Sequence, residues 1–290
     1  VLYFLCQWLL TVVVVRAGNY EYAGVFSLAI AFSNIFSYIG AWGVRGVQVS
    51  DVNGEYSNGA YGGTRIVTVG LSILVFPVVL LLYGYTGELA WCCVAAVGYK
   101  LLESVTDLNF GTMQKLNRYD WIAVSYALKG LFPLGAFVAG LKLSGGLLPA
   151  LIAMSVAYLA ILVVYDVPRL RGSGLLKPRF DKTIELLKKC LPLMLNGMVN
   201  AWLVYLPRHA VQTQLGSEML GYYGSISEEI YRFRNLGMYT TNSTSLGRWL
   251  DWAYQFNLSS GFLWVYILMY RLANRKKLSV PLFLCIGVSL

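Results

Sequence analysis

The stretch LAWCCVAAVGYKLLESVTDLNF, residues 89–110, decides the fold class of this chain. It is predominantly apolar, and its length suits a helix that crosses the roughly 30 Å hydrocarbon core of a bilayer. Its charged residues Lys100, Glu103 and Asp107 are spaced i, i+3 and i+7, so they share one face of a helix. A long apolar helix with one charged face is typical of a membrane bundle whose interior is polar.

Similar apolar segments lie on both sides of this stretch. We expect spans at residues 23–44, 66–85, 121–141, 147–165 and 190–206. Residues 1–15 are apolar but short, and we expect them to be the end of a first span whose beginning is missing. None of these segments alternates as a β-barrel strand does. Between them, the glycine-rich residues 59–63 are expected to form a flexible loop. The sequence therefore predicts an all-α, polytopic transmembrane helical bundle.

The composition of the whole chain agrees with this class. Of 290 residues, 57% are hydrophobic and only 13% are charged, whereas soluble domains carry about 25% charged residues. This balance disfavours a soluble enzyme, a disordered tail and a disulfide scaffold. The net charge of +9 is expected to reflect cytoplasmic loops, so we expect no nucleic-acid partner.

Few residues are suited to covalent or metal chemistry. The chain has one His and five Cys without a C-x-x-C pair, so we expect no metal site. It has no G-x-x-x-x-G-K-[ST] phosphate loop and no G-x-S-x-G elbow. We therefore expect no catalytic residues, no cofactor and no enzymatic activity.

The distribution of Lys and Arg predicts the orientation, because cytoplasmic loops are enriched in them. If the first loop lies outside, the outer loops carry Arg16, Lys142 and Arg208. The inner loops then carry eleven basic residues: Arg45, Arg65, Lys115, Arg118, Arg169, Arg171, Lys177, Arg179, Lys182, Lys188 and Lys189.

The longest loop divides the chain. We expect an N-terminal bundle of about six spans at residues 1–165 and a basic cytoplasmic linker at residues 166–189. An amphipathic helix at residues 177–190 suits the anionic leaflet. Residues 190–290 are expected to form an incomplete second bundle with an atypical tail after about residue 227. Residues 228–251 are polar, and only residues 256–270 and 280–290 suit a membrane there. We expect a truncated or frameshifted chain.

Ionisable residues inside the spans are the candidate functional groups. Charge at membrane depth is costly, so Lys100, Glu103, Asp107 and Lys129 are expected to face a cavity or one another. One hypothesis is structural: Lys100 pairs with Glu103, and Lys129 pairs with Asp107. The other is a polar cavity with cations for an anionic substrate and a carboxylate for ion coupling. Asn196 and Asn200 form a further polar face.

Three stretches resemble the polysaccharide-biosynthesis or O-antigen flippases of the multidrug/oligosaccharidyl-lipid/polysaccharide exporter superfamily. The first runs from Arg16-Ala-Gly-Asn-Tyr to Trp42-Gly-Val-Arg45. The second runs from Lys100-Leu-Leu-Glu103 through Asp107 and Gly111-Thr-Met-Gln114 to Ser125. The third contains Cys190-Leu-Pro192, Leu206-Pro207-Arg208 and Leu220-Gly221. The resemblance covers roughly residues 1–227.

The resemblance implies a MATE-like six-helix bundle followed by a second one. It implies a flippase that moves polyprenyl-pyrophosphate-linked oligosaccharide across the bacterial inner membrane by alternating access. The substrate contacts would then come from Arg16, Arg45, Lys100, Lys129, Arg208, Asn196 and Asn200. Glu103 or Asp107 would exchange H⁺ or Na⁺. Expected partners are membrane lipids, the lipid-linked substrate, a polysaccharide polymerase and a chain-length regulator.

Other hypotheses remain open. Arg16, Arg45 and Arg208 also suit snorkelling at an interface. A drug-efflux transporter of the same fold would favour a net acidic cavity. A membrane-embedded glycan-modifying enzyme would favour a large outer loop, and a non-functional fragment would explain the incomplete second bundle.

Overall fold

The fold is helical throughout the described part of the chain. The computed structural model describes residues 2–17 and 20–240, with the side chains of residues 2–16 and 20–225. The chain divides into two units, Val1–Ser225 and Ile226–Leu290, and the account below concerns the first. Six of the described helices are long and apolar enough to cross a membrane. The prediction of an all-α, multi-pass membrane bundle is confirmed. The segments predicted at residues 256–270 and 280–290 lie outside the described residues.

Each predicted span overlaps a helix, but several bounds differ, most of all at α4 and α9. In chain order they are α1 (Leu2–Ala17), α2 (Tyr20–Ala41), α3 (Val44–Ser50), α4 (Asn58–Leu82), α5 (Gly87–Lys115), α6 (Tyr119–Ser144), α7 (Leu147–Ile161), the π-helical turn η1 (Leu162–Asp166), α8 (Val167–Arg169) and α9 (Thr183–Thr240). The elements α7, η1 and α8 follow one another directly as a single apolar segment, Leu147–Arg169. Short loops join most neighbours, as expected for antiparallel helices in a bundle.

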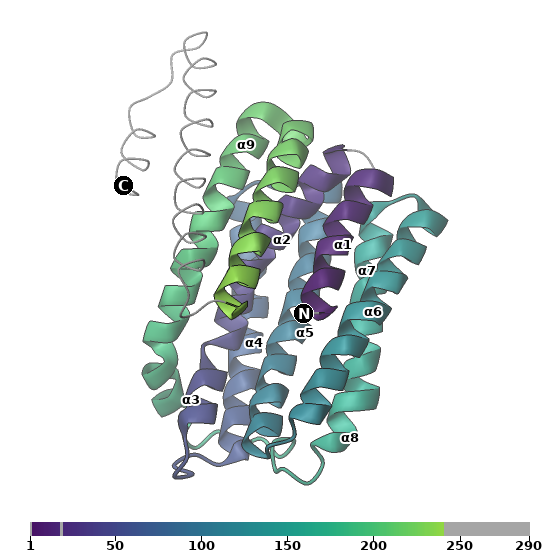
Figure 1. Ribbon diagram of the computed structural model, residues 1–290. Helices are drawn as coiled ribbons and strands as arrows, with labels where there is room; N and C mark the ends of the chain where they lie inside the picture. The colour runs from purple at the N-terminus through teal and green to yellow at the C-terminus, as the bar shows by residue number, and fades with distance from the viewer. Residues whose placement is uncertain (1, 18–19, 241–290) are drawn as a thin grey trace. The chain divides into compact units, whose positions relative to one another are not determined.

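Helix α5 is the centre of the first unit. It packs against α2, α3, α4, α6 and α7, while α1 packs against α2 and α6 (Figure 1). Aromatic side chains fill the interior, for example Tyr99 of α5 against Tyr158 of α7 with ring centroids 5.2 Å apart. Leu74, Leu81 and Leu82 of α4 are instead strongly exposed. Exposed apolar side chains on a spanning helix suit contact with lipid tails.

The residues 59–63 are helical, so the prediction of a flexible loop there is wrong. Helix α4 begins at Asn58, where the Ser57 hydroxyl accepts a hydrogen bond from the backbone N–H of Ala60 at 3.2 Å. A side chain on Gly62 or Gly63 would collide with the backbone of residues 175 or 179. The glycines therefore let the segment before α9 lie directly on the first turns of α4.

This early start of α4 also moves Arg65. The predicted inner loop contained Arg65, but the structure places it inside the spanning helix α4, where it is buried. That prediction was wrong because the small residues that precede Arg65 continue the helix and do not interrupt it.

Helix α9 begins at Thr183, so residues 177–182 of the predicted amphipathic helix are not helical. Its course is broken at Gly216, whose φ of 85° and ψ of 176° are not helical. Glycine adopts this backbone conformation without strain. Residues after the break pack on the start of α2, where Tyr222 stacks on Tyr20 with ring centroids 4.0 Å apart.

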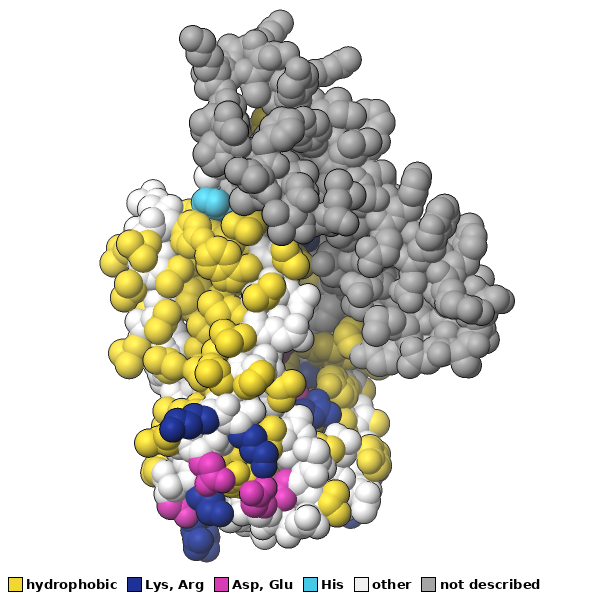
Figure 2. Space-filling model, turned by 90° about the vertical axis from the view of Figure 1, so that its left-hand side faces the viewer, with side chains coloured by type: hydrophobic (Ala, Val, Ile, Leu, Met, Phe, Trp, Pro, Cys, Tyr) yellow, Lys and Arg dark blue, Asp and Glu magenta, His cyan; other side chains and the backbone are white. Residues whose placement is uncertain are grey.

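Charged side chains gather at one end of the first unit. Figure 2 shows a broad apolar area above a group of Lys, Arg, Asp and Glu side chains. Contacts between loops explain the grouping: Lys189 of α9 pairs with Glu55 at 2.9 Å, and Lys115 of α5 lies 3.8 Å from Asp51. Loops predicted to lie on one side of the membrane therefore meet at one end of the bundle.

Candidate functional site

The candidate site is a row of charged pairs along α5. Its outermost member joins Lys100 to Glu103, with the ammonium nitrogen 2.7 Å from the carboxylate. The Tyr3 hydroxyl of α1 donates a second hydrogen bond to Glu103. The two charged side chains are 17% and 21% exposed, so the pair is only partly covered by the protein. The expected pairing of Lys100 with Glu103 is confirmed.

The next pair joins α3 to α5. Arg45 donates to Asp107 at 2.8 Å, and its other terminal nitrogen lies 3.4 Å from the Gln114 amide oxygen. The side chains of Arg45 and Asp107 are 30% and 35% exposed. The expected pairing of Lys129 with Asp107 is therefore wrong, since the carboxylate of Asp107 binds the guanidinium that follows the second span.

Lys129 has a different partner, which the sequence did not reveal. Its ammonium pairs with Asp166 of η1 and donates to the Thr106 hydroxyl at 2.9 Å. The Ser125 hydroxyl donates to the same carboxylate at 2.8 Å. The side chains of Lys129 and Asp166 are 1% and 0% exposed. This pair is sealed from solvent, unlike the two pairs above.

Asp166 was missed because the expected span ended at residue 165. The sequence does hold a signal for it, because Met154, Tyr158, Leu162 and Asp166 recur every four residues and so share one helix face. All four are buried in the structure. A π-helical turn at residues 162–166 keeps this stripe facing α6. Such turns are frequent at functional sites.

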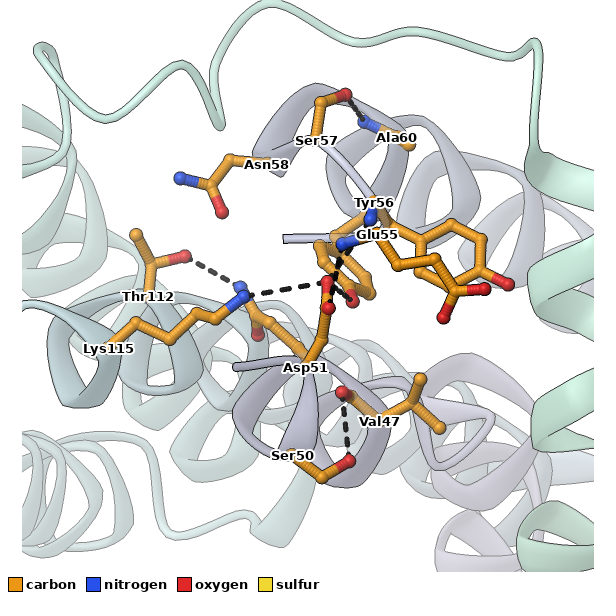
Figure 3. Close-up of polar contacts among 12 residues, drawn as sticks. Val47, Ser50, Asp51, Glu55, Tyr56, Ser57, Asn58, Ala60, Thr112 and Lys115 are labelled. Atoms are coloured by element: carbon orange, nitrogen blue, oxygen red, sulfur yellow. Dashed lines mark hydrogen bonds and ion pairs between the residues drawn. The ribbon is translucent and has the colours of Figure 1, made fainter. Parts of the chain in front are cut away.

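The inner end of the row is a polar cluster centred on Asp51. Figure 3 shows the Asp51 carboxylate among its donors. It accepts hydrogen bonds from the backbone N–H groups of Glu55 at 2.8 Å and Tyr56 at 3.1 Å, and from the Tyr61 hydroxyl at 2.9 Å. Burial alone raises the pKa of Asp51, but these donors outweigh it and hold the pKa below its usual value. Asp51 is thus an ionised anchor for the loop before α4.

A second polar contact lies beside this cluster. The Gln48 amide of α3 donates to the Thr112 hydroxyl of α5 at 2.9 Å, and both residues are buried. It ties α3 to the inner end of α5 and so fixes the position of Arg45, three residues earlier.

The remaining predicted site residues lie apart from this row. Arg208 of α9 is buried and donates to the Ser27 hydroxyl at 3.0 Å and to the Val204 carbonyl at 2.9 Å. Arg16 at the end of α1 is exposed, as are Asn196 and Asn200. The Asn200 amide donates to the Asn196 carbonyl at 2.8 Å, within one helical turn. The structure therefore brings together Arg45, Lys100, Glu103 and Asp107, with Lys129 buried beside them.

These groups suit the binding of charge more than covalent chemistry. Two cation–carboxylate pairs in a bundle of apolar helices are partly exposed. A charge at membrane depth must remain paired, so an incoming ion would exchange with an existing partner. Within the described residues, His, Cys, Asp and Glu form no group of three that could hold a metal ion.

Comparison with known proteins gives one informative relative. The chain is 22% identical over 228 residues to the capsular polysaccharide biosynthesis protein CapF of Staphylococcus aureus. The match covers 77% of this chain and 56% of that protein, so the chain spans about half the length of the relative. No family model and no solved structure matches the chain. The chain is related to a protein of polysaccharide biosynthesis.

Proposed function

We propose that this chain is a flippase that moves a polyprenyl-pyrophosphate-linked oligosaccharide across a membrane. The observation that carries the proposal is the row of partly exposed cation–carboxylate pairs on α5, in a multi-pass helical bundle. A lipid-linked sugar has an apolar tail, a dianionic headgroup and a polar glycan, so its passage requires a charged interior path. The relationship to a capsular polysaccharide biosynthesis protein supports this substrate class.

The pairs suggest how binding is coupled to ions. A pyrophosphate group competes with Asp107 for the guanidinium of Arg45, and Arg binds phosphate through two parallel N–H groups. The displaced carboxylate cannot remain as an unpaired charge in a low-dielectric interior. The carboxylate therefore takes up H⁺ or Na⁺. It releases that ion when the headgroup leaves and Arg45 pairs with Asp107 again. Glu103 and Lys100 can make the same exchange one helical turn further along α5.

The other predicted contacts have supporting places in this scheme. Arg208 connects α9 to Ser27 of α2 and so lies where two parts of the bundle meet. The exposed side chains of Arg16, Asn196 and Asn200 remain predicted substrate contacts. Lys129 becomes a substrate ligand only if its pair with Asp166 opens. We propose no catalytic residue and no resident cofactor.

The cellular setting follows from the substrate class. We propose the bacterial inner membrane as the location, with the basic end of the bundle in the cytoplasm. A polysaccharide polymerase and a chain-length regulator would consume the flipped repeat units, so they are the proposed protein partners.

The proposal is tested by complementation. The full chain is expressed in a bacterial strain that lacks its repeat-unit flippase, and surface polysaccharide is quantified. We expect restoration of surface polysaccharide with loss of lipid-linked repeat units from the inner leaflet. Export of cationic dyes without any surface polysaccharide would instead favour a drug-efflux transporter.

A further inference from the structure

Arg65 is a buried cation that the row on α5 does not use. It lies on α4 and is 3% exposed. One terminal nitrogen, Nη1, donates to the Gly40 carbonyl at the end of α2. The Thr68 hydroxyl, one turn further along α4, donates to the same carbonyl at 2.8 Å. Both lone pairs of that oxygen are thus occupied.

The opposite edge of the Arg65 guanidinium has no acceptor. Nε and Nη2 are buried and lack a hydrogen-bond partner among the described residues. These two nitrogens form one edge with parallel N–H groups, which matches two oxygens of a phosphate or carboxylate. Buried polar groups in native proteins are almost always satisfied, so this edge calls for an acceptor.

The described part of the surrounding chain does not supply that acceptor. The groups that act on Arg65 electrostatically are Asp107 of α5 and the Cys190 thiol of α9. The Asp107 carboxylate already binds Arg45 at 2.8 Å. Asp107 therefore acts on two cations, while its carboxylate pairs with Arg45. A water molecule would accept an N–H from Arg65 but would leave this excess positive charge uncompensated.

We propose that the Nε–Nη2 edge of Arg65 binds a phosphate group at the inner end of the bundle. The site lies where the end of α2, the start of α4 and the start of α9 meet. Asp107, which acts on Arg65 electrostatically, is 35% exposed. The shared chemistry is a pyrophosphate. If that pyrophosphate belongs to the lipid-linked substrate, the site rests on the proposed function.

The test measures binding to the purified full chain in detergent. Inorganic pyrophosphate is titrated at constant ionic strength while the melting temperature is recorded, and a polyprenyl pyrophosphate is titrated in a second arm. We expect a saturable rise in melting temperature for the wild type. Arg65→Lys keeps a donor for the Gly40 carbonyl but lacks the two-nitrogen edge, so its midpoint should rise at least tenfold. Arg118→Lys is the matched control because Arg118 is an exposed cation paired with Asp120, and its midpoint should not change.

A second measurement leaves Arg65 intact. Cys190 and Cys6 are both buried, so maleimide reaches either thiol only when the bundle opens locally. Pyrophosphate should slow the labelling of Cys190 in the wild type and leave that of Cys6 in α1 unchanged. A response to both ligands supports a general pyrophosphate site, and a response to the polyprenyl form alone supports the lipid-linked source. An Arg65→Lys midpoint equal to that of the wild type, or no response to either ligand, overturns the proposal. Pyrophosphate binding without complementation would retain this site and refute the flippase.

Discussion

Lys129 of α6 and Asp166 of η1 form an ion pair that is almost completely removed from solvent, with side-chain exposures of 1% and 0%. Thr106 and Ser125 complete the hydrogen bonds of the two charges. A buried pair of this kind holds its helices in one arrangement, because separating the charges in a low-dielectric interior is costly. The partly exposed pairs on α5 can exchange partners, whereas this pair fixes α6 against the end of α7.

Replacing one member of the buried pair should destabilise the bundle. Lys129→Met leaves the Asp166 carboxylate buried without a counter-charge, which costs about 3–5 kcal/mol. The double variant Lys129→Met/Asp166→Leu removes both charges and should regain most of the lost stability. Thermal unfolding of the detergent-purified protein measures both effects.

The double variant also separates two roles of Lys129. If the pair only joins helices, the stable double variant should export polysaccharide. If Lys129 is a substrate ligand, as its residue type suggested, the double variant should be stable and inactive. A double variant as unstable as Lys129→Met would contradict the pairing itself.

Arg45 should be required for export but not for membrane insertion. Arg45→Ala removes the guanidinium that would bind the headgroup and leaves Asp107, which is 35% exposed, free to meet water or a small cation. We expect surface polysaccharide in the complemented strain to fall at least tenfold at equal protein level. Arg45→Lys keeps the charge without the two-nitrogen geometry and should give intermediate export.

The control for this experiment is Arg118→Ala. Arg118 is a cation at the neighbouring start of α6, and it pairs with Asp120 at 2.9 Å on the exposed surface. Its loss should leave export near the wild-type level. An equal loss of export in Arg45→Ala and Arg118→Ala would show that export depends on the total positive charge at the inner end of the bundle. Arg45 would then have no specific role.

The sequence predicted the positions of the helices better than the ion-pair partners of the charged residues on them. Apolar length alone identified the spans, because a bilayer imposes a minimum helix length. Helical spacing placed Lys100, Glu103 and Asp107 on one face and correctly paired the first two. The other pairs depend on which helices are neighbours, and spacing along one helix carries no such information. Arg45 and Asp166 lie just beyond apolar runs of the sequence, which favoured an interface or loop position for each. In the structure Arg45 pairs with Asp107 of α5, and Asp166 pairs with Lys129 of α6.

Asp51 should make the stability of the protein depend on pH in the acid range. Its pKa is lower in the folded protein than the unfolded value of about 3.9. A carboxyl group with a lowered folded pKa stabilises the fold above its unfolded pKa, and this contribution is lost as the pH falls through the folded pKa. Wild type should therefore melt above Asp51→Asn at pH 7, and the difference should shrink below about pH 4. Asp120→Asn, at a side chain that is 57% exposed, should show a much smaller difference at pH 7.

Gly63 should be intolerant of any side chain because of the segment that lies on α4. A Cβ at this position would overlap the backbone of Arg179, whose N–H donates to the Gly59 carbonyl at 2.8 Å. Gly63→Val must push residues 173–179 away from α4, and overpacking of this kind costs about 1–3 kcal/mol. The displaced segment should also be cleaved faster by trypsin after Arg179, whereas Lys177 precedes Pro178 and is not a tryptic site. The matched control is Gly70→Ala in the same helix, since nothing lies within 4 Å of its added methyl group. The Gly70→Ala variant should melt at or above the wild-type temperature, because Ala favours a helix over Gly by about 1 kcal/mol. Equal melting temperatures and equal trypsin rates for Gly63→Val and Gly70→Ala would show that the segment does not depend on the glycine face.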